Sequence, residues 1–453
     1  MMLLAFSYIS AQETYKFSGG SGTKQDPYQI SSIKDLNELN KMTNDDTGNT
    51  SKTDGKYYLL TNDIKEPFTG MIGTEANFNG NFDGGNHCIN LSINRTWDKY
   101  PSGLFGTATR GSIKNLSVEG SVNIMCGAAI VGNPSGGEIL ENLVNFANVT
   151  AKSTSQLAGV GGVIGNIVSR ASDNVGVTVK NCANYGTITC YGGAVGGVIG
   201  YSGQQIGNTI ENIANYGHIV GKASYGEWGK EIRVAGVIGN PLYKDKVDKI
   251  LNFGTTADLS IVGVIGNSNP TTINNIFYDC QLCPSNNGIE TQKLTTNKAI
   301  GLTMKDILSE SNWLLEDGMY PRPRMNGIEK SQRAILFATP ILLAEGDNIK
   351  NITTDFKVTI KNNVTWTCKN KKVNINSQGE VKLLKEGEET LIATLGNYKR
   401  EIVINIKKVN GINNIENNKN IKQDVWYNLN GVRIQKPNNK GIYIHNGQKT
   451  IVK

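Results

Sequence analysis

Apolar residues in the middle of the chain recur in one short phrase instead of forming long amphipathic runs. The phrase is Gly-Gly-Val-Ile-Gly at residues 161–165, and full or looser copies occupy residues 103–106, 128–132, 196–200, 235–239 and 262–266. The copies follow one another at intervals of about 26–39 residues, a period that indicates stacked structural repeats.

Each repeat has a second half, which is a short apolar strand flanked by asparagine. Copies of this half occupy residues 114–118, 142–146, 181–188, 212–219, 251–254 and 274–278. Glycine and asparagine tolerate the left-handed backbone of sharp corners. Asparagines at one repeat position can also donate to each other as an amide ladder. The pattern predicts an all-β chain with a parallel β-helix over residues 12–326.

The two ends of the repeat region carry different patterns. Ile33, Leu36 and Leu39 share one face of a predicted short helix, which Ser32 caps and which can close the open end of the solenoid. Residues 327–333 form a polar linker. Residues 334–408 contain short alternating strands without the repeat, which predict a small β-sandwich.

The C-terminal residues predict a separate module. Residues 409–422 are rich in asparagine and read as a linker. In residues 423–453, the pairs Asn430-Gly431 and Asn446-Gly447 stand between alternating strands, and they predict hairpins with type I′ turns.

Composition excludes some function classes. The 453 residues include 52 Gly but only 11 Pro, which suits repeated tight turns. The net charge is +7, and the sequence has no dense stripe of Lys and Arg. This charge pattern does not indicate a nucleic-acid-binding surface. After residue 12 we find no run of about 18 apolar residues, so we expect no transmembrane segment.

Residues 1–11 predict a secretory signal peptide with cleavage after Ala11. A short apolar run ends there in small residues and then turns polar. A buried N-terminal strand is the alternative interpretation.

The seven cysteines give an odd count, so at least one lacks an intramolecular partner. Cys182 stands where other repeats have Leu143 and Ile213, which predicts a core position. Cys280 and Cys283 form a lone C-x-x-C, which suits a local disulfide or two unconnected thiols better than zinc.

The glycine phrase followed by the asparagine-containing strand resembles the GLUG repeat of bacterial cell-surface proteins. Residues 82–87, 103–106 and 313–323 share the resemblance. The resemblance implies a surface protein. It also implies a right-handed coil, which is usual for such solenoids. GLUG repeats also occur in IgA-directed metalloproteases, but His87, His218 and His445 do not form their H-E-x-x-H zinc signature.

Two further resemblances concern the C-terminal third. Trp366, residues 373–381 and residues 386–394 resemble a group 2 bacterial Ig-like domain. Cys368 has no second cysteine there, so the antibody-type disulfide is excluded. Residues 427–431 and 440–444 resemble the sorting tail of secreted Bacteroidetes proteins, which implies export and outer-surface attachment through a type IX-like route. A plain terminal mini-sheet is the alternative.

We predict no catalytic, metal-binding or cofactor-binding residue. Asp63, Glu75 and Asp83 lie in the first coils, and Asp83 fits a hydrogen bond within its glycine-rich turn better than general acid or base chemistry.

Aromatic residues are the stronger hint of a ligand site. Phe146, Tyr185, Tyr216 and Phe253 share one repeat position, where they form either an exposed column or, as we favour, core or corner packing. We expect ligand contact in the longer insertions instead. The predicted contact residues are Trp97, Tyr100, Tyr225 and Trp228.

The sequence therefore predicts a secreted or surface-associated, adhesin-like protein that recognises a glycan or a host or cell-surface protein. One alternative is a carbohydrate-active enzyme on the β-helix, either a polysaccharide lyase or a glycosidase. The other is a purely structural surface component.

Overall fold

The computed structural model describes most of the chain. The described residues are 15–45, 51–74, 76–97, 101–152, 158–169, 172, 174–190, 192–204, 206–221, 224–225, 231–232, 234–241, 244–257, 260–266, 272–285, 291–407 and 425–452. The predicted signal peptide and the predicted linker 409–422 lie outside them. The chain divides into two compact units, Met1–Val409 and Asn410–Lys453, which we treat separately.

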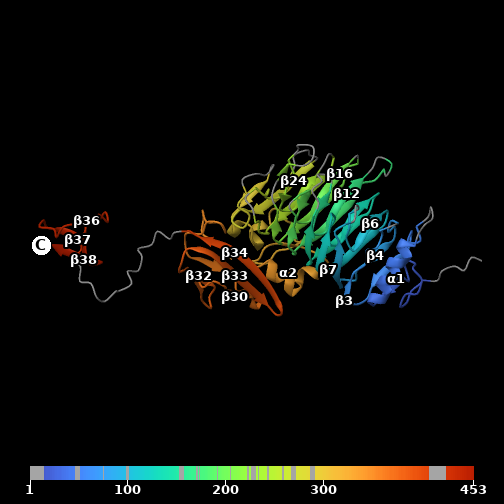
Figure 1. Cartoon of the computed structure of the whole chain (residues 1–453), viewed down its shortest axis with the longest axis horizontal. Helices are drawn as coiled ribbons and strands as arrows, with labels where there is room; N and C mark the ends of the chain where they lie inside the picture. Colours follow the sequence, from blue (N-terminus) through green and yellow to red (C-terminus); the bar gives the residue numbers. More distant parts are fainter. Residues whose placement is uncertain are drawn as a thin grey trace, which may run out of the picture. The chain divides into compact units, whose positions relative to one another are not determined.

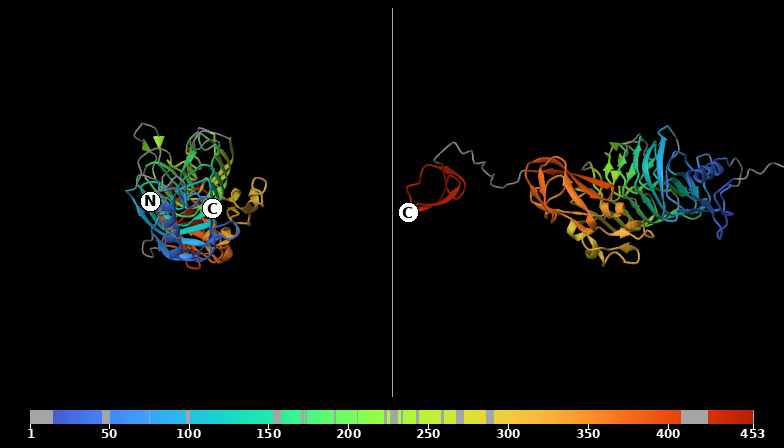
Figure 2. Two further views of the ribbon diagram at one scale, coloured as in Figure 1. Left: turned by 90° about the vertical axis from the view of Figure 1, so that its right-hand side faces the viewer. Right: turned by 90° about the horizontal axis from the view of Figure 1, so that it is seen from below.

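The first unit is built on parallel strands that stack one coil on the next (Figures 1 and 2). The path through its longest sheet is β1 (Tyr28–Ile30), β2 (Tyr57–Leu60), β4 (Asn81–Asp83), β7 (Ser112–Ile124), β9 (Ile139–Asn145), β13 (Thr178–Asn184), β17 (Thr209–Asn215), β23 (Lys246–Asn252), β24 (Thr272–Asp279) and β25 (Gln292–Leu294). The strands off this path are β3 (Ile64–Phe68), β5 (Cys88–Arg95), β10 (Asn148–Ala151), β14 (Ile188–Thr189) and β18 (Ile219–Val220).

Two further parallel sheets complete the coils. The first contains β6 (Phe105–Thr109), β8 (Val131–Ser135), β12 (Ile164–Ser169), β16 (Ile199–Gln204) and β22 (Ile238–Pro241). The second contains β11 (Gly159–Val160), β15 (Ala194–Gly196) and β21 (Val234–Ala235). The predicted all-β class and parallel β-helix are confirmed.

Apolar side chains line the inside of the coils in rows of one residue per coil. Cys182 pairs in register with Ile213, Ile213 with Ile250, and Ile250 with Ile276. Cys182 is fully buried, as its place in the repeat predicts. Such rows make a continuous core from strands that are too short to bury an apolar face alone.

A ladder of four buried asparagines connects successive coils. Asn145 donates to Asn184 over 2.8 Å, Asn184 to Asn215 over 2.8 Å, and Asn215 to Asn252 over 3.0 Å. Each Oδ1 of this ladder also accepts the backbone N–H two residues further on. The predicted amide ladder is confirmed.

The recurring glycines make room for this ladder. A Cβ on Gly162 would lie 2.3 Å from Asn184 Oδ1, and one on Gly197 would lie 2.5 Å from Asn215 Cγ. No real side chain fits at that distance. The glycine phrase and the asparagine position therefore depend on each other.

A second asparagine position bends the strands of the long sheet. These residues are in the left-handed region, with φ between 51° and 56°: Asn115, Asn142, Asn181, Asn212 and Asn275. Asparagine accepts this conformation at low cost.

The first end of the solenoid carries helix α1 (Ile33–Asn44). Its N-terminus is a reciprocal cap, because Asp35 N donates to Ser32 Oγ while Ser32 N donates to Asp35 Oδ2. Leu36 and Leu39 are fully buried. The predicted helix and its cap residue are confirmed.

Residues 334–407 contain two antiparallel sheets. One contains β28 (Ile341–Leu342), β29 (Phe356–Val358), β32 (Glu380–Leu383) and β31 (Val373–Ile375). The other contains β30 (Thr365–Cys368), β33 (Gly387–Leu395) and β34 (Tyr398–Ile406). We call this part the sandwich.

The sandwich follows the solenoid without an extended linker. The segment assigned to a linker from sequence begins with a 3-10 turn, Ile328–Lys330, and runs into helix α2 (Gln332–Phe337), which Ser331 caps. Ile328 and Glu329 are buried, and Arg333 Nη1 lies 2.6 Å from Glu119 Oε2 of the solenoid. This segment is therefore part of the contact between the two parts.

The aromatic repeat position forms the centre of that contact. Ring centroids are 5.1 Å apart for Phe146 and Tyr185, 4.6 Å for Tyr185 and Tyr216, and 5.6 Å for Tyr216 and Phe253. Tyr320, from the segment before the sandwich, continues the stack 4.5 Å from Phe253. We call these five rings the aromatic column.

The second unit is a small antiparallel sheet. Its strands, in order, are β36 (Arg433–Ile434), β35 (Trp426–Tyr427), β37 (Gly441–His445) and β38 (Gln448–Val452). Asn446 and Gly447 have φ of 51° and 79°, which confirms the predicted type I′ turn. The same prediction is wrong at residues 430–431, where only Gly431 has positive φ. There Asn428 Oδ1 accepts the N–H groups of Asn430 and Val432 and holds a different turn.

One corner of the solenoid buries a carboxyl group. Glu138 is fully buried, and its Oε2 accepts the Gly111 N–H at 2.7 Å. Burial raises the pKa of Glu138 to about 8, and the Gly111 bond opposes that shift. The folded protein therefore holds a proton here at neutral pH.

We predict that Asn184→Ala lowers the free energy of unfolding by about 3 kcal/mol or more, because it leaves the amides of Asn145 and Asn215 without their partner. Asn184→Asp keeps the shape but loses the donor, so we expect a comparable loss. Urea denaturation of the full chain measures both. Asn374→Ala, at an exposed position, should change stability by less than about 0.5 kcal/mol. Equal effects of Asn184→Ala and Asn374→Ala would contradict the ladder's role.

We predict that Phe253→Ala destabilises the protein by about 3–5 kcal/mol, because it removes a fully buried ring between Tyr216 and Tyr320. Trp97→Ala is the control, since Trp97 is 69% exposed and its loss should cost about 0.5 kcal/mol or less. Thermal and urea unfolding measure the difference. Similar stabilities for the two variants would argue against a packed aromatic column.

We predict that Glu138→Gln flattens the pH dependence of stability. Since the folded pKa of about 8 is above the unfolded value of about 4.3, the folded chain binds more protons between them. The stability that Glu138 contributes is complete below the unfolded pKa and is lost as pH rises through the folded pKa. Denaturation at about pH 5 and pH 8 measures it. Parallel pH profiles for wild type and Glu138→Gln would contradict a raised pKa, and Glu141→Gln is the control.

Candidate functional site

The boundary between the solenoid and the sandwich contains three adjoining hollows, with volumes of about 820, 260 and 560 Å³. The first two share Phe146, Arg333 and Tyr398 as lining residues. The second and third share Asn148, Thr187, Phe337 and Lys399. We call the three hollows together the groove.

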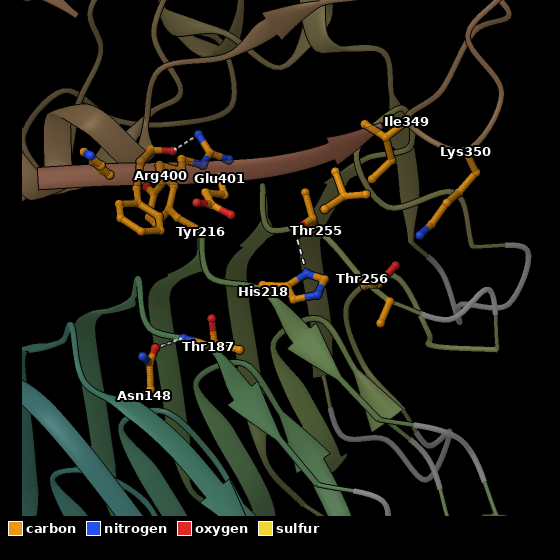
Figure 3. Close-up of a pocket in the computed structure, with 14 residues that line it drawn as sticks. Asn148, Thr187, Tyr216, His218, Thr255, Thr256, Ile349, Lys350, Arg400 and Glu401 are labelled. Carbon is orange, nitrogen blue, oxygen red and sulfur yellow. Dashed lines mark hydrogen bonds between the residues drawn. The ribbon is translucent and has the colours of Figure 1, made fainter. Parts of the chain in front are cut away.

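The floor of the groove is a row of polar residues from successive coils, Asn148, Thr187, His218 and Thr255 (Figure 3). Each stands two positions after the aromatic residue of its repeat. Thr187 N donates to Asn148 Oδ1 over 3.0 Å, and His218 Nδ1 shares a hydrogen bond of 2.8 Å with Thr255 Oγ1. Asn148 is exposed and the other three are half-buried, so the row is open to solvent.

The roof comes from the sandwich. Along β34, Lys399, Glu401 and Val403 line the groove, and the alternate residues are buried. Lys350, in the loop between β28 and β29, lines the same hollow as His218 (Figure 3). Two cationic side chains and one carboxylate therefore reach the hollow from this side.

Arg400 holds the roof in place and is not available to a ligand. Its Nη1 donates to Phe337 O over 2.7 Å and to Thr339 O over 3.0 Å. Burial lowers the pKa of Arg400 to about 10, so it remains charged at neutral pH. Phe337 is the last residue of α2 and Thr339 follows two residues later, so Arg400 joins the end of this helix to β34.

Arg333 holds the opposite end of the groove. Besides its ion pair with Glu119, its guanidinium lies 4.8 Å from the centre of the Phe146 ring and 4.9 Å from that of Tyr398. These contacts join solenoid and sandwich through one side chain. Phe146, only partly buried, is the member of the aromatic column that a molecule in the groove can reach.

His218 provides a neutral hydrogen-bonding group at pH 7. Burial lowers its pKa, and the nearby Lys350 charge acts in the same direction, while a hydrogen bond with the Thr255 backbone opposes the shift. The floor therefore presents an amide, two hydroxyls and a neutral imidazole.

The groove does not contain the residues that the sequence singled out for contact. Trp97 is described and exposed, but it is not among the residues that line the groove. Tyr225 lies in β19 (Ser224–Tyr225), which pairs with β20 (Glu231–Ile232), and its side chain is outside the described residues. Tyr100 and Trp228 also lie outside them.

The aromatic column is buried, as the favoured interpretation held. Tyr185, Tyr216 and Phe253 are each at most 1% exposed. They do not join the core inside the coils, however. They pack in a second core with Trp313, Tyr320 and the sandwich. These three rings pack against a part of their own chain and leave no face for a ligand.

The acidic residues of the first coils serve local structure. Asp83 Oδ1 accepts Gly85 N at 2.9 Å and Asn115 Nδ2 at 3.0 Å, which confirms the predicted turn bond. Asp63 Oδ1 accepts Cys88 N at 3.0 Å and lies 3.2 Å from His87 Nδ1. Glu75 is outside the described residues.

The cysteines and other potential metal ligands show no assembled site in the described part of the chain. Of the described residues, no three His, Cys, Asp or Glu are placed to hold a metal ion. All seven cysteines are described and none is in a disulfide. Cys280 and Cys283 are thus two unconnected thiols, one of the two alternatives.

Sequence reasoning missed the polar row of the floor. Asn148, Thr187, His218 and Thr255 differ in type, so they do not stand out as a motif. Aligning the repeats on the aromatic residue and reading two positions further would have found them. Lys350 and Lys399, on the sandwich side of the groove, lie outside the sequence repeats. No repeated pattern could therefore have identified them.

Comparisons with known proteins show a partial similarity. No family model and no solved structure matches the chain. The chain is 31% identical over 163 residues to halomucin of Haloquadratum walsbyi, and the match covers 32% of this chain but 2% of that protein. The chain thus spans a small fraction of that relative's length. Within the described residues, no helix is both long and apolar enough to cross a membrane.

Proposed function

We propose that this protein is a surface-associated binding protein without catalytic activity, and that it recognises a glycan or a protein ligand in the groove. The polar floor carries the proposal, because it repeats a hydrogen-bonding group once per coil beside an otherwise buried boundary. Concave sites with a few convergent polar groups are the usual place for ligands.

The surface location has two supports. The similarity to a short part of halomucin is one. The other is the resemblance of residues 427–431 and 440–444 to a Bacteroidetes sorting tail, which favours export and attachment through the C-terminal module. In that module, Ile442 and Ile451 face each other across β37 and β38 and are 40% and 64% exposed, so an apolar surface is available to a partner.

We propose binding in preference to catalysis because the groove's ionisable groups are spread along it. Glu401 is the only carboxylate among the described lining residues of the 560 Å³ hollow. Glycoside hydrolysis in most families needs a pair of carboxyl groups flanking one bond. The GLUG and Ig-like resemblances agree with a repeat surface protein that carries a spacer domain.

We predict that Thr187→Trp abolishes ligand binding, because an indole at the middle of the floor fills the groove. The full chain is tested on arrays of glycans and cell-surface proteins. Thr367→Trp, on an exposed position of β30, should bind as the wild type does. Circular dichroism and thermal unfolding show that both variants fold. Wild-type binding that survives in Thr187→Trp, or an array without any ligand, would overturn the proposal.

A further inference from the structure

The polar floor has a fixed period along the solenoid axis. Val149 pairs in register with Ile188, Ile188 with Ile219, and Ile219 with Thr256. The floor residues each precede one member of this row, so they stand in line, one per coil. Neighbouring strands are about 4.8 Å apart, and the floor therefore presents a polar group roughly every 4.8 Å.

This period suits an extended glycan better than an extended peptide. A peptide strand advances about 3.3 Å per residue, so its groups would fall out of step with the floor. A sugar residue in an extended chain advances by nearly one inter-strand distance. Successive rings would therefore meet equivalent positions on successive coils.

The chemistry of the floor also matches sugar hydroxyls. Hydroxyl groups donate and accept at once, and so do the side chains of Asn148, Thr187 and Thr255. The neutral His218 behaves in the same way. The half-buried Phe146 ring lines one end of the groove, where Tyr185 and Arg333 occupy its faces and leave its edge for contact with a sugar ring.

The charges that face the floor favour an anionic ligand. The amines of Lys350 and Lys399 form no ion pair with a described residue, although both lysines line the hollow above His218. Glu401 is the one opposing carboxylate described there. At the far end Lys65 and Asp63 both line the groove and the charge of Arg333 is already paired with Glu119, so the charge selection rests on the end with Lys350 and Lys399.

We propose that the groove holds an extended anionic glycan that runs along the solenoid, with about one sugar residue per coil and its carboxylate or sulfate groups against Lys350 and Lys399. This inference rests on the proposed binding function and narrows it to one ligand class. The floor fixes the direction of the chain through hydrogen bonds. The two lysines of the roof select for charge.

The test is calorimetric titration of the full chain with defined oligosaccharides. One series is oligogalacturonides of two, four and six residues, with their methyl esters as uncharged partners of the same backbone. A second series is κ-carrageenan oligosaccharides with their desulfated forms. The two series distinguish carboxylate from sulfate as the source of charge.

We predict that affinity rises from the dimer to the tetramer and then levels off, because the floor provides four coils. Removal of the charge should weaken binding about tenfold or more, and added salt should weaken the charged ligand selectively. Lys350→Gln combined with Lys399→Gln should lose about the same factor. Glu401→Gln should tighten binding, and Lys382→Gln, exposed on β32, should leave it unchanged.

Each contrary result has a distinct meaning. If the uncharged forms bind as tightly as the charged ones, or the double lysine variant binds normally, the charge selection is wrong while the binding function stands. If none of these glycans binds but a protein ligand is lost in Thr187→Trp, the glycan inference fails and the groove remains a binding site. If no ligand of either kind binds the wild type, the proposed function itself fails.

Discussion

The buried amide ladder of Asn145, Asn184, Asn215 and Asn252 is the constraint on which the rest of the structure depends. Its polar atoms are fully enclosed, and they are satisfied only when each coil stands in register with the next. A slip of one residue would leave several buried donors and acceptors without partners. This requirement fixes the register of the coils that the ladder joins, and Gly162, Gly197 and Gly236 lack a side chain where a Cβ would strike the ladder.

The same register places one aromatic residue per coil on the outside of the coils and one polar residue just beyond it. The four aromatic rings of the solenoid cannot remain in water without exposing a large apolar patch, so the chain covers them with Tyr320, α2 and the sandwich. The segments that cover the rings do not fill the space over the polar floor of the groove, which begins beside them. The groove is therefore a consequence of how the column is buried. Arg333 joins the solenoid to the sandwich beside it, and Arg400 joins α2 to β34.

The solenoid could be predicted from the sequence because its signals are local and repeated. The glycine phrase, the asparagine positions, the core place of Cys182 and the Ser32 cap each involve residues close together or one period apart. The docking of the sandwich could not be predicted in this way. It depends on contacts such as Gln281 Nε2 to Asp347 O, which join residues 66 positions apart that have no common pattern. The candidate site was missed for the same reason, since one of its walls lies in each part.

Hydroxyl-radical footprinting of the full chain tests most directly whether the aromatic column is a contact within the chain. Tyr185, Tyr216 and Phe253 should react only at background level, while the exposed Trp97 reacts rapidly in the same sample and serves as the internal standard. Rapid modification of Tyr185 and Tyr216 in the folded protein would contradict the covered column, and with it the origin of the groove.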